Sequence, residues 1–285
     1  FETGLSAYLL ANKFKLPMQV QIHTDFLSHH FRKSMLNQIR VLIARFIVSR
    51  ADGLRVVSSF IKDSIKNSFR GLKIEPEVLP VYVDVEKIIN TPITKDIDKD
   101  FPDFKFIILM ASRLSREKRI DVAIKAMKEV VEKFPQTGLV ICGSGKEKNK
   151  LKAYTKRLNL EKSVVFAGWH EDLISYYKTA NLFLLTSEYE GYGMTLVEAG
   201  AAGCPIVTTK VGIAKTELFK DGFNCEICKF FDSSCVAESV ISVISDNQKR
   251  ELFKHRKQDS IRSMVSSREE YVSKYINLLE SVLKK

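Results

Sequence analysis

The chain has 285 residues, of which 45% are hydrophobic and 28% charged, and its net charge is +11. This composition is typical of a globular protein with one large or two medium domains. No run reaches the roughly 20 apolar residues of a membrane span, and no secretory signal is visible. The basic excess indicates an anionic partner such as phosphate, nucleic acid or a lipid headgroup, although a solubilising surface is the commoner explanation.

The five cysteines are an odd number, which favours a reducing compartment, and we expect the chain in the cytoplasm. Cys225 and Cys228 form a single C-x-x-C without a second pair at metal-ligand spacing. Buried small residues are therefore expected here, ahead of a zinc or redox site. The sequence begins at Phe1, without a Met and in the middle of a residue pattern. We therefore expect that an upstream part is missing.

Strands and helices alternate from the start of the chain, which predicts a parallel sheet. The expected elements of the first part are helix 5–14, strand 18–23, helix 34–50, strand 54–57, a helix from 58 or 59 to about 69, and strand 78–81. Helix 34–50 carries three arginines spread around it. That distribution favours a packed helix over a membrane-surface helix with one basic stripe.

Residues 91–103 are polar, contain two prolines and lack periodicity, so a domain boundary is predicted there. A second alternating series follows, whose strands are continuous apolar runs, as in a sheet covered on both faces. Its expected strands are 105–111, 138–142, 163–166, 181–186 and 205–209, and its expected helices are 119–134, 146–158, 171–179, 194–202, 232–246, 248–264 and 268–284.

The stretch 187–199 leads from a strand into a helix, which is where α/β proteins bind ligands. Glu190 and Glu198 lie eight residues apart in it. Gly191 and Gly193 allow the backbone to approach a ligand, and the N–H groups from Gly193 to Leu196 offer a site to an anion. Two unrelated surface glutamates remain an alternative on the spacing alone.

Two further loops follow strands of the second series. Arg113 and Lys118 suit a diphosphate, because a guanidinium matches phosphate oxygens bidentately and an ammonium adds a mobile charge. A solvated basic loop is the open alternative. The loop with Gly143 and Gly145 is neither a dinucleotide fingerprint nor a P-loop, but it can pass close to a base or ribose.

Together, these loops resemble a known family. The resemblance rests on Ser112-Arg113-Leu114 with Glu117-Lys118, on Gly143-Ser144-Gly145, on 165–168, on 187–199 and on 203–207, in this order and spacing. The chain resembles the retaining, nucleotide-sugar-dependent glycosyltransferases of the E-x7-E type, which are the family 4-like enzymes with the GT-B fold. The similarity covers nearly all residues.

The resemblance implies an α/β protein with two Rossmann-like domains facing a cleft, the first of them incomplete. Residues 1–92 are then the partial acceptor-side domain, 93–102 the linker, 103–265 the donor domain and 266–285 a helix that crosses back. The implied reaction is retaining, metal-independent transfer of a hexose from a nucleoside-diphosphate sugar to a hydroxyl acceptor, without a cofactor. The implied setting is glycolipid or cell-surface polysaccharide synthesis.

The resemblance also implies roles for individual residues. Glu190 lies against the transferred sugar, Glu198 holds the donor ribose, and His23 lies beside the reacting sugar. The remaining donor contacts are the diphosphate ligands Arg113 and Lys118, the backbone of Met194, Thr195 and Leu196 at the phosphates, Gly191 and Gly193 in the same loop, and Gly143 and Gly145 at the nucleoside. The leaving phosphate accepts the proton of the incoming hydroxyl, so the two glutamates hold the donor and are not an acid and base pair.

The chain departs from the family pattern at Ser112 and Arg119, which replace glycines. Arg119 is expected to add charge beside the phosphate site, and either to compensate for or to block a close backbone approach. The basic ends predict peripheral contact with the anionic inner face of a membrane. The expected acceptor is lipid-linked, a saccharide or another hydroxyl compound. No nucleic-acid partner is expected. Two alternatives stay open: a non-catalytic or truncated sugar-nucleotide-binding protein, and an epimerase or phosphorylase, which the lack of an evident cofactor lysine disfavours.

Overall fold

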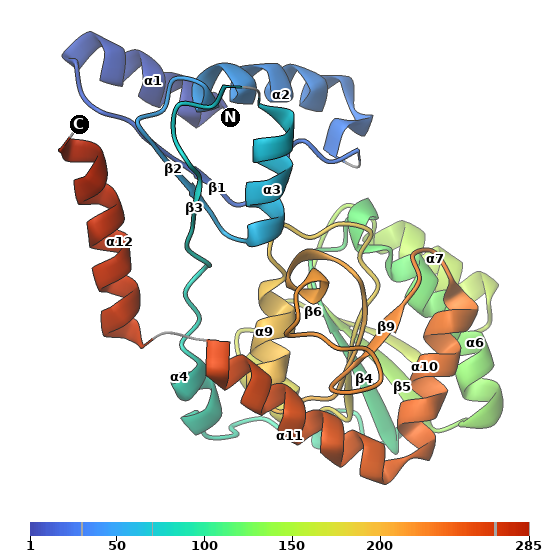
Figure 1. Ribbon diagram of the computed structural model, residues 1–285. Coiled ribbons are helices and arrows are strands. Elements are labelled where there is room, and N and C mark those ends of the chain that lie inside the picture. Colours follow the sequence, from blue (N-terminus) through green and yellow to red (C-terminus); the bar gives the residue numbers. More distant parts are fainter. Residues whose placement is uncertain (30, 70, 265–266, 285) are drawn as a thin grey trace. The chain divides into compact units, whose positions relative to one another are not determined.

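The computed structural model describes residues 1–29, 31–69, 71–264 and 267–284 (Figure 1). The chain divides into two compact units. The first comprises Phe1–Tyr82 together with the C-terminal helix α12 (Arg268–Leu283), and the second comprises Val83–Val265. Within the described ranges, no helix is long and apolar enough to cross a bilayer.

The first unit contains a parallel sheet of three strands in the order β1–β2–β3. Its elements are α1 (Glu2–Phe14), β1 (Gln19–Ile22), η1 (Phe31–Lys33), α2 (Met35–Val48), β2 (Gly53–Val56), α3 (Ser59–Ser68) and β3 (Glu77–Val78). The expected strands and helices are confirmed with small shifts at their ends. β3 stops before Pro80, which has no N–H to donate to a neighbouring strand.

A buried arginine of β2 connects the sheet of the first unit to α12. Arg55 is only 4% exposed, and its guanidinium donates to the carbonyls of Leu79 and Pro80 at 3.0 and 2.8 Å. It also donates to the Tyr271 hydroxyl of α12 at 2.8 Å. The charge is thus fully hydrogen-bonded, as burial requires. The C-terminal helix therefore packs on the first unit.

The second unit is built on a parallel sheet of six strands in the order β6–β5–β4–β7–β8–β9. Its strands are β4 (Phe106–Ala111), β5 (Thr137–Cys142), β6 (Val164–Gly168), β7 (Leu182–Leu185), β8 (Ile206–Thr209) and β9 (Glu226–Cys228). Its helices are α4 (Val85–Asn90), α5 (Ile97–Asp100), η2 (Arg116–Lys118), α6 (Ile120–Lys133), α7 (Lys148–Arg157), α8 (Leu173–Thr179), α9 (Met194–Ala201), η3 (Gly212–Lys215), α10 (Ser233–Ser245) and α11 (Asn247–Met264).

The strand order of this sheet indicates where a ligand site is expected. From β4 the chain moves outward through β5 and β6, then returns to the other side of β4 with β7 and continues outward through β8 and β9. The order therefore reverses between β4 and β7, which pair directly. In open α/β sheets, ligands bind outside the carboxyl ends of the strands at such a point.

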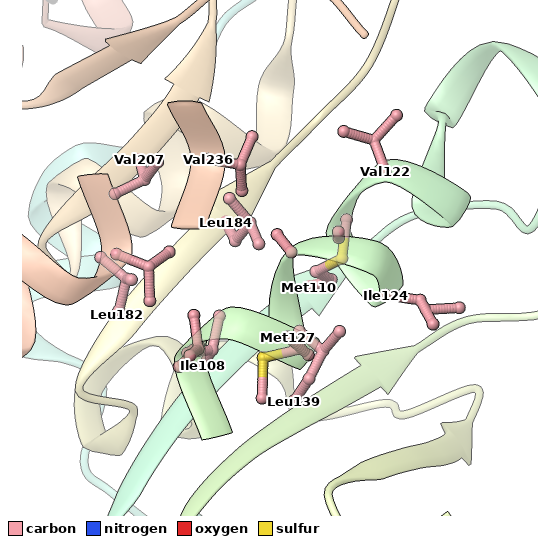
Figure 2. Packing of buried hydrophobic residues seen from close by; sticks show 14 of the residues in the cluster. Ile108, Met110, Val122, Ile124, Met127, Leu139, Leu182, Leu184, Val207 and Val236 are labelled. Atoms are coloured by element: carbon pink, nitrogen blue, oxygen red, sulfur yellow. The ribbon is translucent and has the colours of Figure 1, made fainter. Parts of the chain in front are cut away.

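Both faces of the larger sheet are covered, since every residue of β4, β5, β7 and β8 is buried. Figure 1 shows α6 and α10 on one side of this sheet and α9 on the other. Alternate strand residues such as Ile108, Met110 and Leu184 meet Met127 of α6 and Val236 of α10 in one apolar cluster (Figure 2). The continuous apolar runs of the sequence are explained by this double coverage.

The division between the units lies between Tyr82 and Val83, before the segment expected as linker, 93–102. That segment is bound to α8 of the second unit. The backbone N–H of Thr94 donates to the Ser175 hydroxyl at 3.0 Å, and that of Ile97 donates to Thr179 Oγ1 at 3.1 Å. The polar residues of this region thus hydrogen-bond within the second unit, and its first helices, α4 and α5, were not predicted.

The C-x-x-C segment behaves as a pair of buried small residues. Cys225 and Cys228 are at most 3% exposed, and both thiols are free. Burial raises the pKa of Cys225 to about 11 and that of Cys228 to about 12. Both sulfurs are therefore protonated thiols near neutral pH, which makes them poor nucleophiles.

Candidate functional site

The loops that follow β4 and β7 are joined to each other at the point where the strand order reverses. The Thr186 hydroxyl lies 3.2 Å from the carbonyl oxygen of Lys118 and 2.9 Å from that of Arg119. The N–H of Glu188 donates to the carbonyl of Glu117 at 2.8 Å. These bonds fix the two loops side by side, so their functional side chains meet.

Lys118 and Glu190 form the centre of this site. The Lys118 Nζ lies 2.7 Å from Glu190 Oε1, and the two side chains are only 12% and 11% exposed. The Ser187 hydroxyl donates to the same carboxylate oxygen at 2.7 Å. Partial burial strengthens this charge pairing relative to a surface pair. An ammonium and a carboxylate are thus held together at the sheet edge where a ligand is expected.

Arg113 presents an exposed charge on the loop after β4. Its side chain is 79% exposed, and its guanidinium lies 3.5 Å from Glu117 Oε1. Glu117 is itself held by the Ser115 hydroxyl at 2.6 Å. A long exposed guanidinium beside a fixed ammonium can bind an anion without breaking a buried contact.

Arg119 does not add free charge to the site, contrary to the expectation from sequence. Its guanidinium makes two bonds to the Asp121 carboxylate, at 3.0 and 2.7 Å, and lies 4.3 Å from the ring centre of Phe231. Its φ of 46° lies in the left-handed region that favours glycine. A glycine, which the resemblance implies at this position, would adopt this conformation without strain. The charge of the Arg119 side chain is paired with Asp121.

The helix α9 begins directly after the loop that carries Glu190. Gly193 precedes the helix with a φ of 92°, a conformation that glycine adopts without strain. The first N–H groups of a helix, here those of Met194 and Thr195, have no acceptor within the helix and attract anions. The loop itself is anchored because the N–H of Ile213 donates to the Tyr192 carbonyl at 2.7 Å.

Glu198 lies within α9 and is half-buried. The hydroxyl of Tyr177, on α8, donates to its Oε2 at 3.2 Å. Burial raises the pKa of Glu198, and the hydrogen bond from Tyr177 partly opposes that effect. A carboxylate in this state accepts hydrogen bonds from neutral donors such as hydroxyl groups.

Gly143 and Gly145 allow two loops to pack on each other. A Cβ on Gly143 would lie 1.9 Å from the carbonyl oxygen of Ser112, and one on Gly145 would lie 2.3 Å from that of Leu114. The N–H of Leu114 in turn donates to the Ser144 carbonyl at 2.8 Å. These glycines are therefore required by the loop that carries Arg113, whether or not a nucleoside lies beside them.

His23 belongs to the first unit and follows β1. Burial, together with the nearby charge of Arg55, lowers the pKa of this histidine, so its imidazole is neutral at pH 7. It lines a largely apolar cavity of about 490 Å³ with residues such as Ile22, Ile47 and Phe26. The structure thus brings together Lys118 and Glu190 in the second unit, whereas His23 lies in the first.

Three participants were missed by the sequence prediction. Ser187 is the first residue of the stretch 187–199, but its hydrogen bond to Glu190 was not predicted. Thr186 and Tyr177 were not marked by any motif, because their roles depend on contacts between separate elements. Among the residues that the structure describes, no three His, Cys, Asp or Glu side chains are grouped so as to hold a metal ion.

The sequence profile described as "Glycosyl transferases group 1" matches residues 94–260, which is more than half of the chain. The chain belongs to this family, and it has the α/β GT-B fold. It is similar to HepE from Anabaena in complex with UDP-glucose, with a TM-score of 0.85 and 22% identity over 100% of this chain and 77% of that one. It is also similar to sucrose-phosphate synthase from Thermosynechococcus elongatus, with a TM-score of 0.84 and 18% identity over 99% and 71% of the two chains.

Curated relatives agree with this family. An uncharacterised glycosyltransferase of Methanocaldococcus jannaschii is 28% identical over 197 residues, which are 68% of this chain and 48% of the relative. The alpha-monoglucosyldiacylglycerol synthase of Streptococcus pneumoniae is 27% identical over 220 residues, which are 73% of this chain and 49% of the relative. The chain thus spans about half the length of these two relatives.

Proposed function

We propose that this protein transfers a sugar from a nucleoside-diphosphate sugar to a hydroxyl acceptor with retention of anomeric configuration. The observation that carries the proposal is the Lys118–Glu190 pair, which lies where the strand order reverses and beside the amino end of α9. This arrangement places a cation, a carboxylate and free helix N–H groups at one ligand site. A donor with a diphosphate and a neutral sugar requires those groups.

In the proposed reaction, the anomeric C–O bond breaks, so the sugar gains positive charge and the diphosphate gains negative charge. Arg113, Lys118 and the N–H groups at the start of α9 stabilise the diphosphate more strongly as it leaves. Glu190 lies against the sugar and fixes its orientation. A leaving phosphate oxygen accepts the proton of the incoming hydroxyl on the same face, and these cations provide the charge stabilisation without a metal.

The other donor contacts follow from the same arrangement. Glu198 accepts hydrogen bonds from the ribose hydroxyls, and the loop of Gly143 and Gly145 lies along the nucleoside. His23, neutral at pH 7, acts on the acceptor side as a hydrogen-bonding group at the reacting sugar. Its lowered pKa supports this part of the proposal because an uncharged imidazole does not repel the developing positive charge on the sugar.

We further propose a lipid-linked or saccharide acceptor and a cytoplasmic protein that binds peripherally to an anionic membrane face. The first unit supports this with exposed apolar side chains near exposed cations such as Lys13 and Lys15. The apolar side chains with more than half of their surface exposed on or next to α1 and α2 are Leu9, Leu10, Phe14, Leu16, Met35, Leu36, Ile39 and Leu42. Sedimentation with anionic vesicles, but not with zwitterionic ones, is the expected result, and equal sedimentation with both would contradict it.

A thermal-shift panel of nucleoside diphosphates and their sugars tests the donor assignment. A ligand at 100 times its dissociation constant adds about 2.7 kcal/mol to the free energy of unfolding, so the correct nucleotide gives a clear upward shift. NMR of the product made from that nucleotide sugar then reports the anomeric configuration, which we expect to be that of the donor. An inverted product would overturn the retaining mechanism, and binding without any product would favour a sugar-nucleotide-binding protein.

A further inference from the structure

The one tryptophan of the chain, Trp169, is exposed at the carboxyl edge of the larger sheet. Its residue surface is 73% exposed, although tryptophan is a large apolar side chain that normally contributes to cores and interfaces. It directly follows Gly168, the last residue of β6. Trp169 therefore lies at the same edge of the parallel sheet as the loops after β4, β5 and β7.

The backbone around Trp169 is bound to the loop proposed to lie along the nucleoside. The N–H of Gly143 donates to the carbonyl of Gly168 at 2.5 Å, so Trp169 is one residue from a direct bond to that loop. The pairing of β5 and β6 shifts register at this point, and Gly168 has a φ of 81°. The strand therefore ends in a sharp change of direction immediately before the tryptophan.

The residue after Trp169 is also fixed. The ring of His170 packs on that of Tyr176 with a centroid distance of 4.8 Å, and the Tyr176 hydroxyl donates to the Asp100 carboxylate at 2.6 Å. Trp169 is thus an exposed indole on a backbone held from both sides. An exposed aromatic group on a rigid support favours binding, because little order is lost when a flat ligand stacks on it.

We propose that Trp169 stacks on the nucleobase of the donor and provides much of the affinity for the nucleoside. This inference rests on the proposed function, since it requires a nucleoside-diphosphate donor. The flat apolar partner that fits an indole beside the Gly143 loop is the base, because the diphosphate is assigned to Arg113, Lys118 and α9. Stacking between a base and an aromatic side chain contributes to affinity and depends weakly on which base is bound. Trp169 therefore supplies affinity without choosing among bases.

The test uses the whole chain and the nucleoside diphosphate that the thermal-shift panel selects. Because the chain has one tryptophan, its emission reports on Trp169 alone. We expect the nucleotide to quench this emission and inorganic pyrophosphate to leave it unchanged. Calorimetry should show that Trp169→Ala weakens nucleotide binding about 10-fold or more, whereas Trp169→Phe retains most of the affinity. Phe14→Ala, which removes an exposed aromatic ring from the first unit, is the control and should bind as the unaltered chain does.

The outcomes separate this inference from the function on which it rests. Nucleotide binding with unchanged emission and an unaffected Trp169→Ala variant would overturn the stacking role and leave the donor assignment standing. An equal loss of nucleotide and pyrophosphate affinity in Trp169→Ala would also overturn it, because the residue would then act only by supporting the loop. Failure of the unaltered chain to bind any nucleoside diphosphate would overturn both.

Discussion

The ammonium of Lys118 and the carboxylate of Glu190 lie 2.7 Å apart, although 72 residues separate them in the chain. They meet because β4 and β7 are neighbours in the sheet and their following loops are hydrogen-bonded to each other. In the proposed reaction, the pair orders the site before the donor arrives. When a diphosphate enters, Lys118 gains a second anionic partner, and Glu190 remains positioned by Ser187.

This pair predicts a coupling energy between the two residues. Lys118→Met should lower the free energy of unfolding by about 1–3 kcal/mol, because it leaves a carboxylate that is 11% exposed without its partner. Glu190→Gln alone should also destabilise. The loss of unfolding free energy in the double variant should be smaller than the sum of the losses in the two single variants. Urea unfolding of all four proteins measures these free energies. Additive losses would show that the pair contributes no interaction energy.

The glycines of the loop after β5 predict a second effect on stability. Gly143→Ala should cost roughly 3 kcal/mol or more, because its Cβ would lie 1.9 Å from a backbone oxygen that cannot move away cheaply. Gly168→Ala is a matched control. Gly168 also has a positive φ, but no atom lies within 4 Å of its added Cβ, so its cost should be near 1 kcal/mol. Melting temperatures compare the two directly, and equal shifts would contradict the close packing of the loops.

Lys257 of α11 predicts a pH dependence of stability. The side chain is fully buried, its Nζ donates to the carbonyl of Leu218 and to Asn224 Oδ1, and burial lowers its pKa to about 8. Below pH 8 both folded and unfolded chains carry the proton, so the cost of burying the charge is fully present. From pH 8 to about 10.5 the folded state releases the proton first, and the free energy of unfolding should rise by about 3 kcal/mol relative to Lys257→Met.

The measurement is chemical unfolding of the unaltered chain and of Lys257→Met at several pH values between 7 and 10.5. The difference between the two proteins is used because other groups that titrate in this range cancel in it. Lys254→Met removes an exposed lysine from the same helix, and it should show no such trend. A difference that stays constant over this range would show that Lys257 titrates at its ordinary pKa.

The Tyr177 contact predicts a pH dependence of donor binding. Glu198 must be ionised to accept hydrogen bonds from both ribose hydroxyls, so affinity should fall as pH drops through its raised pKa. Tyr177→Phe removes the hydrogen bond that favours the ionised form, and it should move this fall to higher pH. Calorimetric titrations from pH 4.5 to 7.5 measure the shift. Glu198→Gln should abolish the pH dependence, and an unchanged profile in Tyr177→Phe would exclude Glu198 as its source.

Much of the fold followed from local patterns in the sequence. The strands β4, β5, β7 and β8 were predicted because they are buried on both faces, which makes each a continuous apolar run. The strand order and the division at Tyr82 were not predicted from periodicity, because they depend on which elements pack together. The segment 93–102 was predicted as a linker because its residues are polar. Polar residues suit exposure to solvent, but they equally suit hydrogen bonding to α8, which is what the structure has.

For the candidate site, the sequence indicated individual residues but not the contacts between them. Glu190, Lys118 and Glu198 were predicted as donor-binding residues from motif spacing, and these roles stay predictions. The bond between Lys118 and Glu190 was not found, since 72 residues separate the partners and the pairing exists only after the sheet forms. The effect of Arg119 was mispredicted for the same reason. Sequence shows a fourth cation in the loop, but not that Asp121 and Phe231 engage it.

The central claim is that the loop after β4 holds the diphosphate of a nucleotide donor, and a calorimetric titration of three proteins tests it most directly. Arg113 and Arg116 have the same charge in the same loop and are both exposed, so neither Arg113→Ala nor Arg116→Ala should change stability by more than about 0.5 kcal/mol. We predict that Arg113→Ala weakens binding of the selected nucleoside diphosphate about 10-fold or more and abolishes sugar transfer, whereas Arg116→Ala binds and transfers like the unaltered chain. Equal binding by all three proteins would contradict the account.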